Sequence, residues 1–412
     1  MNASNPMRPR GAESRPPFGL AALVDPIGVE EFTDRYWERR HLVVTRNRPD
    51  YFDTLLTLSD MDHLLATSKV RSTDLRTVSN GVETPVTDLV SADAGNMATA
   101  VEALYDRYRK GATINMLFLQ EQWPPLTRLC QTLAVELSAS FHVNVYLTPT
   151  ASQGLGAHYD THDVFVAQVH GSKHWRLYEP PLRLPLPSQP HLTGGTELGE
   201  PIAEFDLHPG DLLYMPRGTV HQAVSNDRAS LHLTIGVQPV LWADLVCREV
   251  ERMVRVDERF RESLPVGFAV DDERRRAAER LAAELLADLG TAVAAPARVE
   301  AVLAAGHRQA LLGRKPDLWG HLLDLEVARE VDADTKLVRR MVPAELTVDG
   351  DRAELEFHGK RLRFPAHVEA QLRHVMESDG FTARDLPGPL DDGGRLVLLG
   401  KLLKEGFLTA MR

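Results

Sequence analysis

The stretch that decides the fold is HYDTHDVFVAQVHGSKHW, residues 158–175. It opens with His158 and Asp160, and a third residue, His221, lies far along the chain. Side chains two positions apart in a strand point to the same face, so residues 156–160 are expected to form a strand that delivers both groups into a barrel. Two imidazoles and one carboxylate occupy one face of an octahedral metal and leave three positions open, as in non-haem Fe(II) oxygenases.

Around this stretch, from residue 141 to residue 240, apolar and polar residues alternate with the period of a β-strand. The segment HPGDLLYMPRGTVH, residues 208–221, gives a turn, an apolar strand, a second turn and then the distal histidine. Short strands between Gly and Pro turns are typical of a β-sandwich or barrel. Strands are expected at 143–147, 163–169, 173–178, 211–215, 220–224 and 230–236, with 180–201 as a long surface loop at the barrel mouth.

A chain of 412 residues is too long for one ordinary core and predicts two or three domains. Residues 1–17 are rich in Pro, Arg and Ser and are expected to form a disordered tail. Residues 18–240 are expected to form the barrel domain, and residues 241–340 a helical region. Residues 341–412 combine a hairpin with short helices, which indicates a winged-helix-like module. The fold class is therefore α+β.

Composition excludes several classes of function. No apolar run of about 18 residues occurs, so no membrane span is expected. The net charge of −11 argues against a general nucleic-acid binder, and the last module balances its charges, so no direct DNA binding is expected. Cys130 and Cys247 show no metal or redox spacing, which favours a cytoplasmic location.

Each polar residue of the barrel could have either a functional role or an ordinary structural one. For the triad, the alternative to iron is a cupin-type barrel with polar core residues or another metal, although a structural zinc site would require four ligands. Lys173 opens a strand, and a cation directed into a barrel is costly unless it meets an anion such as a dicarboxylate co-substrate. The alternative is a surface lysine at the turn after Gly171.

Further residues share strand faces with these groups. Asn144 and Tyr146 lie on one face of their strand and are candidates to contact a co-substrate, with ordinary barrel filling as the alternative. Thr234 shares a face with His232 in the last strand. Other residues near the motif are expected to have ordinary roles: His162 and Asp163 facing solvent at a turn, Phe165 and Trp175 in the core.

Residues 158–175 closely resemble the JmjC-type oxygenases of the ribosomal oxygenase group, as do residues 209–218 with His221 and the segment 32–44. The resemblance implies a double-stranded β-helix, or jelly roll, followed by a helical dimerisation region and a winged helix, and hence a homodimer. It implies that the iron ligands are His158, Asp160 and His221. It further implies that Lys173 holds the 2-oxoglutarate C5 carboxylate, with further co-substrate contacts from Asn144, Tyr146 and Thr234.

The resemblance also implies a dioxygenase that uses Fe(II), 2-oxoglutarate and dioxygen to hydroxylate an arginine or histidine of a ribosomal protein. Position 173 is Lys, as in the eukaryotic members, whereas the bacterial arginine hydroxylase has Arg there. The acidic charge suits a basic protein substrate. Three alternatives stay open: the same chemistry on a peptide natural product or small molecule, demethylation of methylated lysine, and a non-catalytic binding scaffold.

Overall fold

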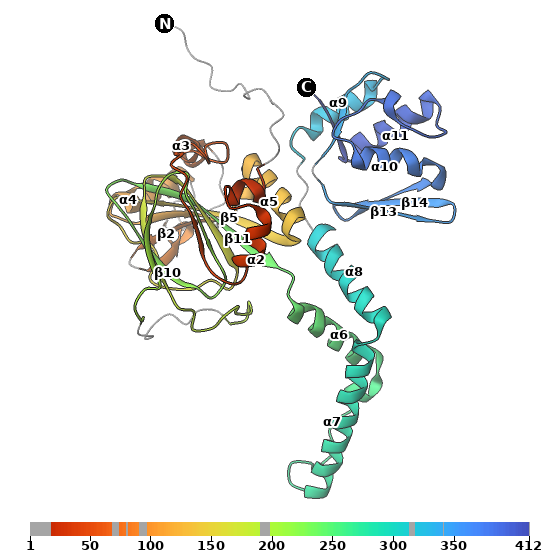
Figure 1. The fold of residues 1–412 in the computed structure, drawn as a ribbon, viewed down its shortest axis with the longest axis horizontal. Coiled ribbons are helices and arrows are strands. Elements are labelled where there is room, and N and C mark those ends of the chain that lie inside the picture. Colours follow the sequence, from red (N-terminus) through yellow and green to blue (C-terminus); the bar gives the residue numbers. More distant parts are fainter. Residues whose placement is uncertain are drawn as a thin grey trace. The chain divides into compact units, whose positions relative to one another are not determined.

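The computed structural model describes residues 18–67, 74–79, 81–89, 97–189, 198–312, 318–340 and 342–411. The tail expected at 1–17 and the middle of the loop expected at 180–201 lie outside the described residues. The chain divides into two compact units (Figure 1). The first runs to Glu136 and resumes over Ser140–Gln238, and the second comprises Leu137–Ala139 and the chain from Pro239 onward.

Two facing sheets form the first unit in the part of the chain that the structure describes. The larger has the order β1-β9-β6-β11-β5-β4-β2-β3, and the smaller has the order β10-β7-β8. The bounds of the larger sheet's strands, in that order, are Leu42–Val44, Leu212–Met215, Asp163–His170, Ser230–Pro239, Ala139–Thr148, Thr113–Met116, Leu75–Ser79 and Val82–Pro85. Those of the smaller sheet are Val220–Ser225, Lys173–Tyr178 and Ala203–Leu207.

The core of this unit explains why the two sheets face each other. Apolar side chains of β6 and β9, among them Val164 and Leu213, pack against Trp175 and Leu177 of β7 in the smaller sheet. Both sheets have antiparallel pairs, such as β6 with β9 and β7 with β10. Such a sandwich removes the inner faces of both sheets from water, which is its main source of stability. The expected jelly roll is thus confirmed.

Helices accompany the sheets in this part of the chain. They are α1 Leu20–Val24, α2 Val29–Arg35, α3 Leu58–Thr67, α4 Met97–Arg109 and α5 Pro124–Leu137. α5 begins with proline, whose fixed φ suits the first turn of a helix, and buries Leu126, Leu129 and Leu133 on one face. In α2, Phe32 is fully buried, and its ring centroid lies 4.9 Å from that of Tyr214. This edge-to-face contact packs α2 against β9.

The observed strands differ from the expected ones at two places that matter for the site. Residues 156–160 do not form a strand: His158 makes one isolated β-bridge to His221, and Asp160 lies in irregular chain after it. The strands β2, β3 and β8 were not predicted from the sequence. β2 and β3 are short and lack a clear alternation, whereas β8 alternates but is only five residues long and follows the loop expected at 180–201. β3 carries Glu83, which lines the cavity described below.

The second unit contains long helices and a smaller mixed segment. The helices are α6 Trp242–Val256, α7 Asp272–Val293, α8 Pro296–Leu312, α9 His321–Glu330, α10 Glu369–Glu377 and α11 Asp392–Lys404. The strands are β13 Ala344–Asp349, β14 Arg352–Phe357 and β15 Lys360–Pro365 in one sheet, and β12 Leu337–Arg339 paired with β16 Leu408–Ala410. Leu355, Leu372 and Leu399 belong to one core there, which unites the sheet with α10 and α11.

The helices α6–α8 are notable for their exposure. α7 starts at a capping aspartate, Asp271, whose side chain accepts hydrogen bonds from the amides of Glu273 and Arg274. None of its residues, all of which the structure describes, is buried. Among the described residues no single helix has the length and apolar character to cross a membrane. The bent pair Asp272–Val293 and Pro296–Arg308 meets that test of length and composition only when the two are taken together.

Candidate metal centre and adjoining cavity

Backbone pairing holds two of the three expected ligands together. The His158 amide donates to the His221 carbonyl at 3.2 Å, and the His221 amide donates back to the His158 carbonyl at 2.8 Å. The Gly218 amide donates to the Asp160 carbonyl at 2.9 Å, which ties the third position to the turn before β10. Gly218 has φ +91°, and a Cβ there would lie 2.3 Å from the Leu182 carbonyl oxygen, so this turn requires glycine.

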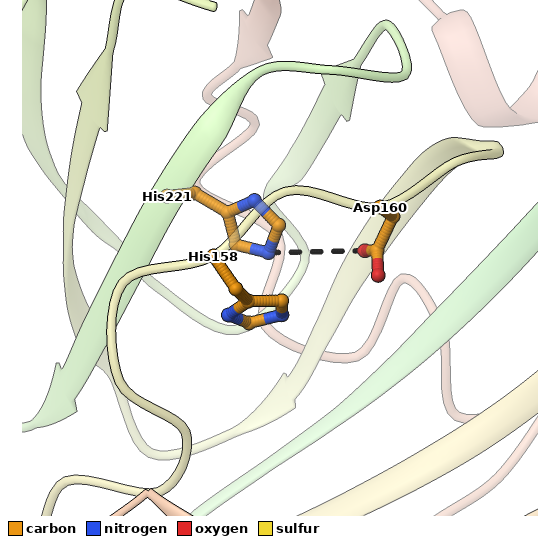
Figure 2. A group of neighbouring side chains, drawn as sticks. All are labelled: His158, Asp160 and His221. Atoms are coloured by element: carbon orange, nitrogen blue, oxygen red, sulfur yellow. Dashed lines mark ion pairs between the residues drawn. The ribbon is translucent and has the colours of Figure 1, made fainter. Parts of the chain in front are cut away.

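The side chains of His158, Asp160 and His221 converge on one point (Figure 2). Their ligand atoms all lie within 4.8 Å of one another, and His221 Nε2 is 3.9 Å from Asp160 Oδ2. His158 Nδ1 lies 2.8 Å from the Gly156 carbonyl, and His221 Nδ1 lies 3.0 Å from the Thr219 carbonyl. Each Nδ1–H therefore donates to the backbone, which leaves the lone pair of each Nε2 for a metal.

The electrostatics keep these groups in the protonation states that a metal requires. Burial lowers the pKa of His221 to about 4, helped by the neighbouring His158, so His221 is neutral. Burial acts to raise the pKa of Asp160, but His221, His162 and His158 outweigh it and bring that pKa below its ordinary value. A neutral imidazole and an ionised carboxylate are the binding forms of these ligands. Three such donors with open positions beside them fit Fe(II) better than a structural zinc ion.

A cavity of about 290 Å³ adjoins the triad, and Lys173 lies on its wall. Lys173 is only 4% exposed, and burial lowers its pKa to about 7. No carboxylate among the described residues forms an ion pair with it. A buried ammonium without a counter-ion costs free energy, so this end of the cavity favours an anionic ligand.

Two buried polar atoms near Lys173 also lack a partner among the described residues. They are Trp175 Nε1 and His232 Nδ1. The His232 ring stacks on the Tyr146 ring at 5.1 Å between centroids, and burial together with the charge of Lys173 lowers the His232 pKa well below its ordinary value. Unsatisfied buried groups are costly, so a ligand that accepts a hydrogen bond here would recover free energy.

The remaining expected contacts divide into two groups. Tyr146 and Thr234 line the cavity, and burial raises the Tyr146 pKa above its ordinary value. Asn144 also lines the cavity, but its Oδ1 accepts a hydrogen bond from the Phe118 amide at 3.1 Å. Asn115 and Glu83, joined at 2.9 Å, were missed from the sequence because β3 was not predicted and nothing local distinguished Asn115 in its strand.

One expectation about the turn after Asp160 was wrong. Asp163 does not face solvent: it is fully buried, with Oδ2 2.7 Å from Nη1 of the buried Arg217 and Oδ1 accepting from the Tyr214 hydroxyl at 3.2 Å. His162 lines the cavity and contacts the His142 ring at 4.8 Å. Burial and the neighbouring His162 lower the His142 pKa to about 4, so that imidazole is neutral. Trp175 is buried as expected but also lines the cavity.

Comparison with known proteins gives consistent findings. Residues 117–245 match the family model described as the JmjC domain. The chain is 34% identical over 277 residues to the bifunctional lysine-specific demethylase and histidyl-hydroxylase NO66 of Dictyostelium discoideum, which covers 62% of this chain and 53% of that protein. It is 29% identical over 401 residues to ribosomal oxygenase 1 of Danio rerio, which covers 88% of this chain and 71% of that protein. The chain thus spans about half the length of the first relative.

Among solved structures, the ribosomal oxygenase YcfD of Escherichia coli in complex with cobalt and 2-oxoglutarate is similar at a TM-score of 0.51 and 17% identity. The similarity covers 93% of this chain and 98% of that chain. At this level of identity the comparison shows a shared fold.

Proposed function

We propose that this chain, which matches the JmjC domain model over residues 117–245 and is similar to the ribosomal oxygenases, is an Fe(II)- and 2-oxoglutarate-dependent dioxygenase that hydroxylates an arginine or histidine side chain of a ribosomal protein. One observation carries the proposal. A His-Asp-His cluster with both Nε2 atoms available opens on the same cavity as a buried lysine without a counter-ion.

The proposed metal ligands are His158, Asp160 and His221. Iron bound there would supply the oxidising chemistry that couples conversion of 2-oxoglutarate and dioxygen to succinate and carbon dioxide with hydroxylation of a C–H bond. The backbone pair between the two histidines holds them in place before any ligand binds. The Nδ1–H donations to carbonyls fix the ring orientations, so little reorganisation is needed on binding.

The opposite end of the cavity would bind the co-substrate. Lys173 would pair with its distal carboxylate, and the carboxylate would restore the lysine pKa toward its ordinary range. The Tyr146 hydroxyl lines the same cavity and is proposed to donate a hydrogen bond to a ligand oxygen. Thr234 lines the same cavity and is proposed as a further contact. The apolar side chains of Val164, Val166 and Met215 limit water in the cavity.

The direct test is mass spectrometry of ribosomal proteins from cells with and without this gene. The proposal expects one protein to gain the mass of a single oxygen atom only when the gene is present. The purified chain should restore that mass in vitro with Fe(II) and 2-oxoglutarate. If no protein changes mass while the chain still releases succinate, a peptide or small molecule is the substrate instead.

A second candidate function is demethylation of methylated lysine, an activity that forms part of the name of the Dictyostelium relative. Hydroxylation of an N-methyl carbon gives a hemiaminal whose C–N bond breaks to release formaldehyde and the demethylated amine, whereas hydroxylation of a side-chain carbon such as a β-carbon leaves the oxygen on the product. An assay for formaldehyde with methyl-lysine peptides therefore separates the two activities. A chain that binds neither Fe(II) nor 2-oxoglutarate would instead be a non-catalytic scaffold.

We further propose that the helices of residues 241–340 form a homodimer interface, with residues 18–240 as the catalytic domain and 341–412 as a winged-helix-like module. α7 exposes Leu281 and Leu286, the latter 66% exposed, along a helix without buried residues. Apolar exposure of this kind is characteristic of interaction surfaces. Leu286→Glu should convert the dimer to a monomer in size-exclusion chromatography, whereas Glu279→Gln on the same helix should not.

The proposed location is the cytoplasm. Cys130 and Cys247 form no disulfide, as expected where thiols stay reduced. Tagging the chain and following it by cell fractionation tests this directly. Recovery of the chain outside the cytoplasm would refute the assignment.

A further inference from the structure

Three aromatic and imidazole rings form a row from the cavity to the protein surface. His162 lines the cavity, and the His142 ring lies 4.8 Å from it in an edge-on arrangement. The Phe118 ring follows at 5.9 Å from His142 and is 43% exposed. We call Phe118, His142 and His162 the ring row. It is separate from the charged end of the cavity at Lys173.

The outermost ring is held in a backbone conformation that a bulky residue rarely adopts. Phe118 has φ +53° and ψ +37°, in the left-handed region. The Asn144 side chain accepts a hydrogen bond from its amide at 3.1 Å, and the Gln120 side chain accepts from the Val143 amide at 2.8 Å. These two bonds fasten the segment after β4 to β5. Strain of this kind persists where the surrounding structure imposes it, and it is concentrated at functional sites.

A glycine in the neighbouring strand makes room for the other two rings. A Cβ on Gly236 of β11 would lie 2.2 Å from Cε1 of His142 and 2.8 Å from Cδ2 of His162. Real Cβ atoms do not approach other atoms this closely, so any other residue would displace both imidazoles. The ring row therefore depends on three segments of the barrel that place rings side by side beside the triad.

The chemistry of the ring row differs from that of the Lys173 end. The three rings include no lysine or arginine, and the pKa of the middle imidazole, His142, is lowered to about 4, so that ring is uncharged at neutral pH. Ring faces attract planar cationic and aromatic groups through their quadrupoles and offer less to an aliphatic chain. A guanidinium or imidazole of a substrate would therefore bind here without competing for the anion site.

We propose that the ring row, which meets the cavity at His162 and the protein surface at Phe118, lies along the path of the substrate and selects a planar arginine or histidine side chain by stacking. This inference rests on the proposed function, since it assigns the specificity of the same site. Phe118 is its specificity-determining residue, and Asn144 and Gly236 act as positioning residues. Asn144 thereby acquires a role other than the co-substrate contact expected from the sequence.

The test uses the full chain loaded with Fe(II) and 2-oxoglutarate in the absence of oxygen. Fluorescent peptides that differ only in a central Arg, His or Leu are titrated, and affinity is measured by anisotropy. The wild-type chain should bind the Arg or the His peptide on the order of tenfold more tightly than the Leu peptide, as expected for one cation–π or ring contact. Phe118→Ala should lose most of this preference, while Phe118→Tyr retains it.

Further variants separate the possible outcomes. Gly236→Ala should reduce the preference by displacing His142, and Val135→Ala, which removes an exposed side chain on α5, should leave it unchanged. Equal affinity of the wild-type chain for all peptides, or a preference that survives Phe118→Ala, would overturn the inference. Affinities for Fe(II) and 2-oxoglutarate are measured on the same samples. If the wild-type chain binds neither, the proposed function fails and the inference fails with it.

Discussion

Replacement of Lys173 by methionine should stabilise the metal-free protein and abolish its response to 2-oxoglutarate. Methionine has a similar shape but no charge, so it removes the buried ammonium without leaving a large cavity. The cost of that ammonium follows from its pKa, which is 10.5 in an unfolded chain and about 7 in the fold. This difference corresponds to about 5 kcal/mol when both states are protonated, at about 1.4 kcal/mol per tenfold change.

The pH dependence of this cost has a definite sign. Between pH 7 and 10.5 the unfolded chain holds the lysine proton and the folded chain does not, so the free energy of unfolding rises with pH in that window. Below pH 7 both states are protonated and the folded state bears the full penalty. The stability gained by Lys173→Met should therefore be about 5 kcal/mol at pH 6 and should fall to about 2 kcal/mol at pH 9.

Urea unfolding followed by tryptophan fluorescence at pH 6 and pH 9 measures this gain. Lys110→Met removes the same charge from a side chain that is 69% exposed and should change the stability by less than about 0.5 kcal/mol. With 2-oxoglutarate and metal at about a hundred times the Kd, the wild-type chain should gain about 2.7 kcal/mol. Lys173→Met should gain none from 2-oxoglutarate. The reasoning would be refuted if Lys173→Met were less stable than the wild type at pH 6. It would also be refuted if the gain in free energy of unfolding were the same at pH 6 and pH 9.

Three further substitutions test other parts of the structure. His158→Ala should abolish specific Fe(II) binding and succinate release, whereas His174→Ala on the smaller sheet should retain both; unchanged turnover in the first variant would exclude the proposed iron site. Asp163→Asn should destabilise the protein by about 3 kcal/mol in urea titrations, because the buried Arg217 guanidinium loses its fully buried charged partner and keeps only Glu38, and a loss below about 1 kcal/mol would contradict that role. Gly210→Ala should cost more than about 2 kcal/mol, because its φ is +90° and the new Cβ would lie 2.0 Å from a backbone carbonyl oxygen, whereas Gly290→Ala within α7 should be neutral or stabilising. Equal thermal midpoints for the two glycine variants would be inconsistent with this account.

The sequence predicts the barrel strands well where alternation is strong. The strands predicted at 163–169 and 173–178 agree with β6 and β7 to within a residue. Spacing and turn context also singled out His158, Asp160 and His221, which the structure brings together. The physical reason given for that spacing was incomplete, however, because residues 156–160 do not form a regular strand. One bridge and one turn contact position the two ligands instead, and both involve residues far away in sequence.

The errors have a common cause in contacts that local sequence does not encode. Asp163 follows a turn and carries a charge, which locally indicates a solvated position. Its burial depends on Arg217, which reaches it from the turn after β9 with Nη1 2.7 Å from the carboxylate. The ring row was missed for the same reason, because Phe118 is distinctive only through its left-handed backbone and its contact with His142.

The reciprocal backbone pair between His158 and His221 has a consequence for which ion occupies this protein inside a cell. Backbone hydrogen bonds, rather than a metal ion, hold the two imidazoles side by side, so the site is formed before a metal binds. Metal binding is then not coupled to folding of the site, and folding cannot discriminate between metal ions. Nickel, copper and zinc bind nitrogen and oxygen donors more tightly than ferrous iron does. Faithful loading would then depend on the free concentrations of the competing ions, and protein recovered from metal-rich medium should carry mixtures that follow the supply.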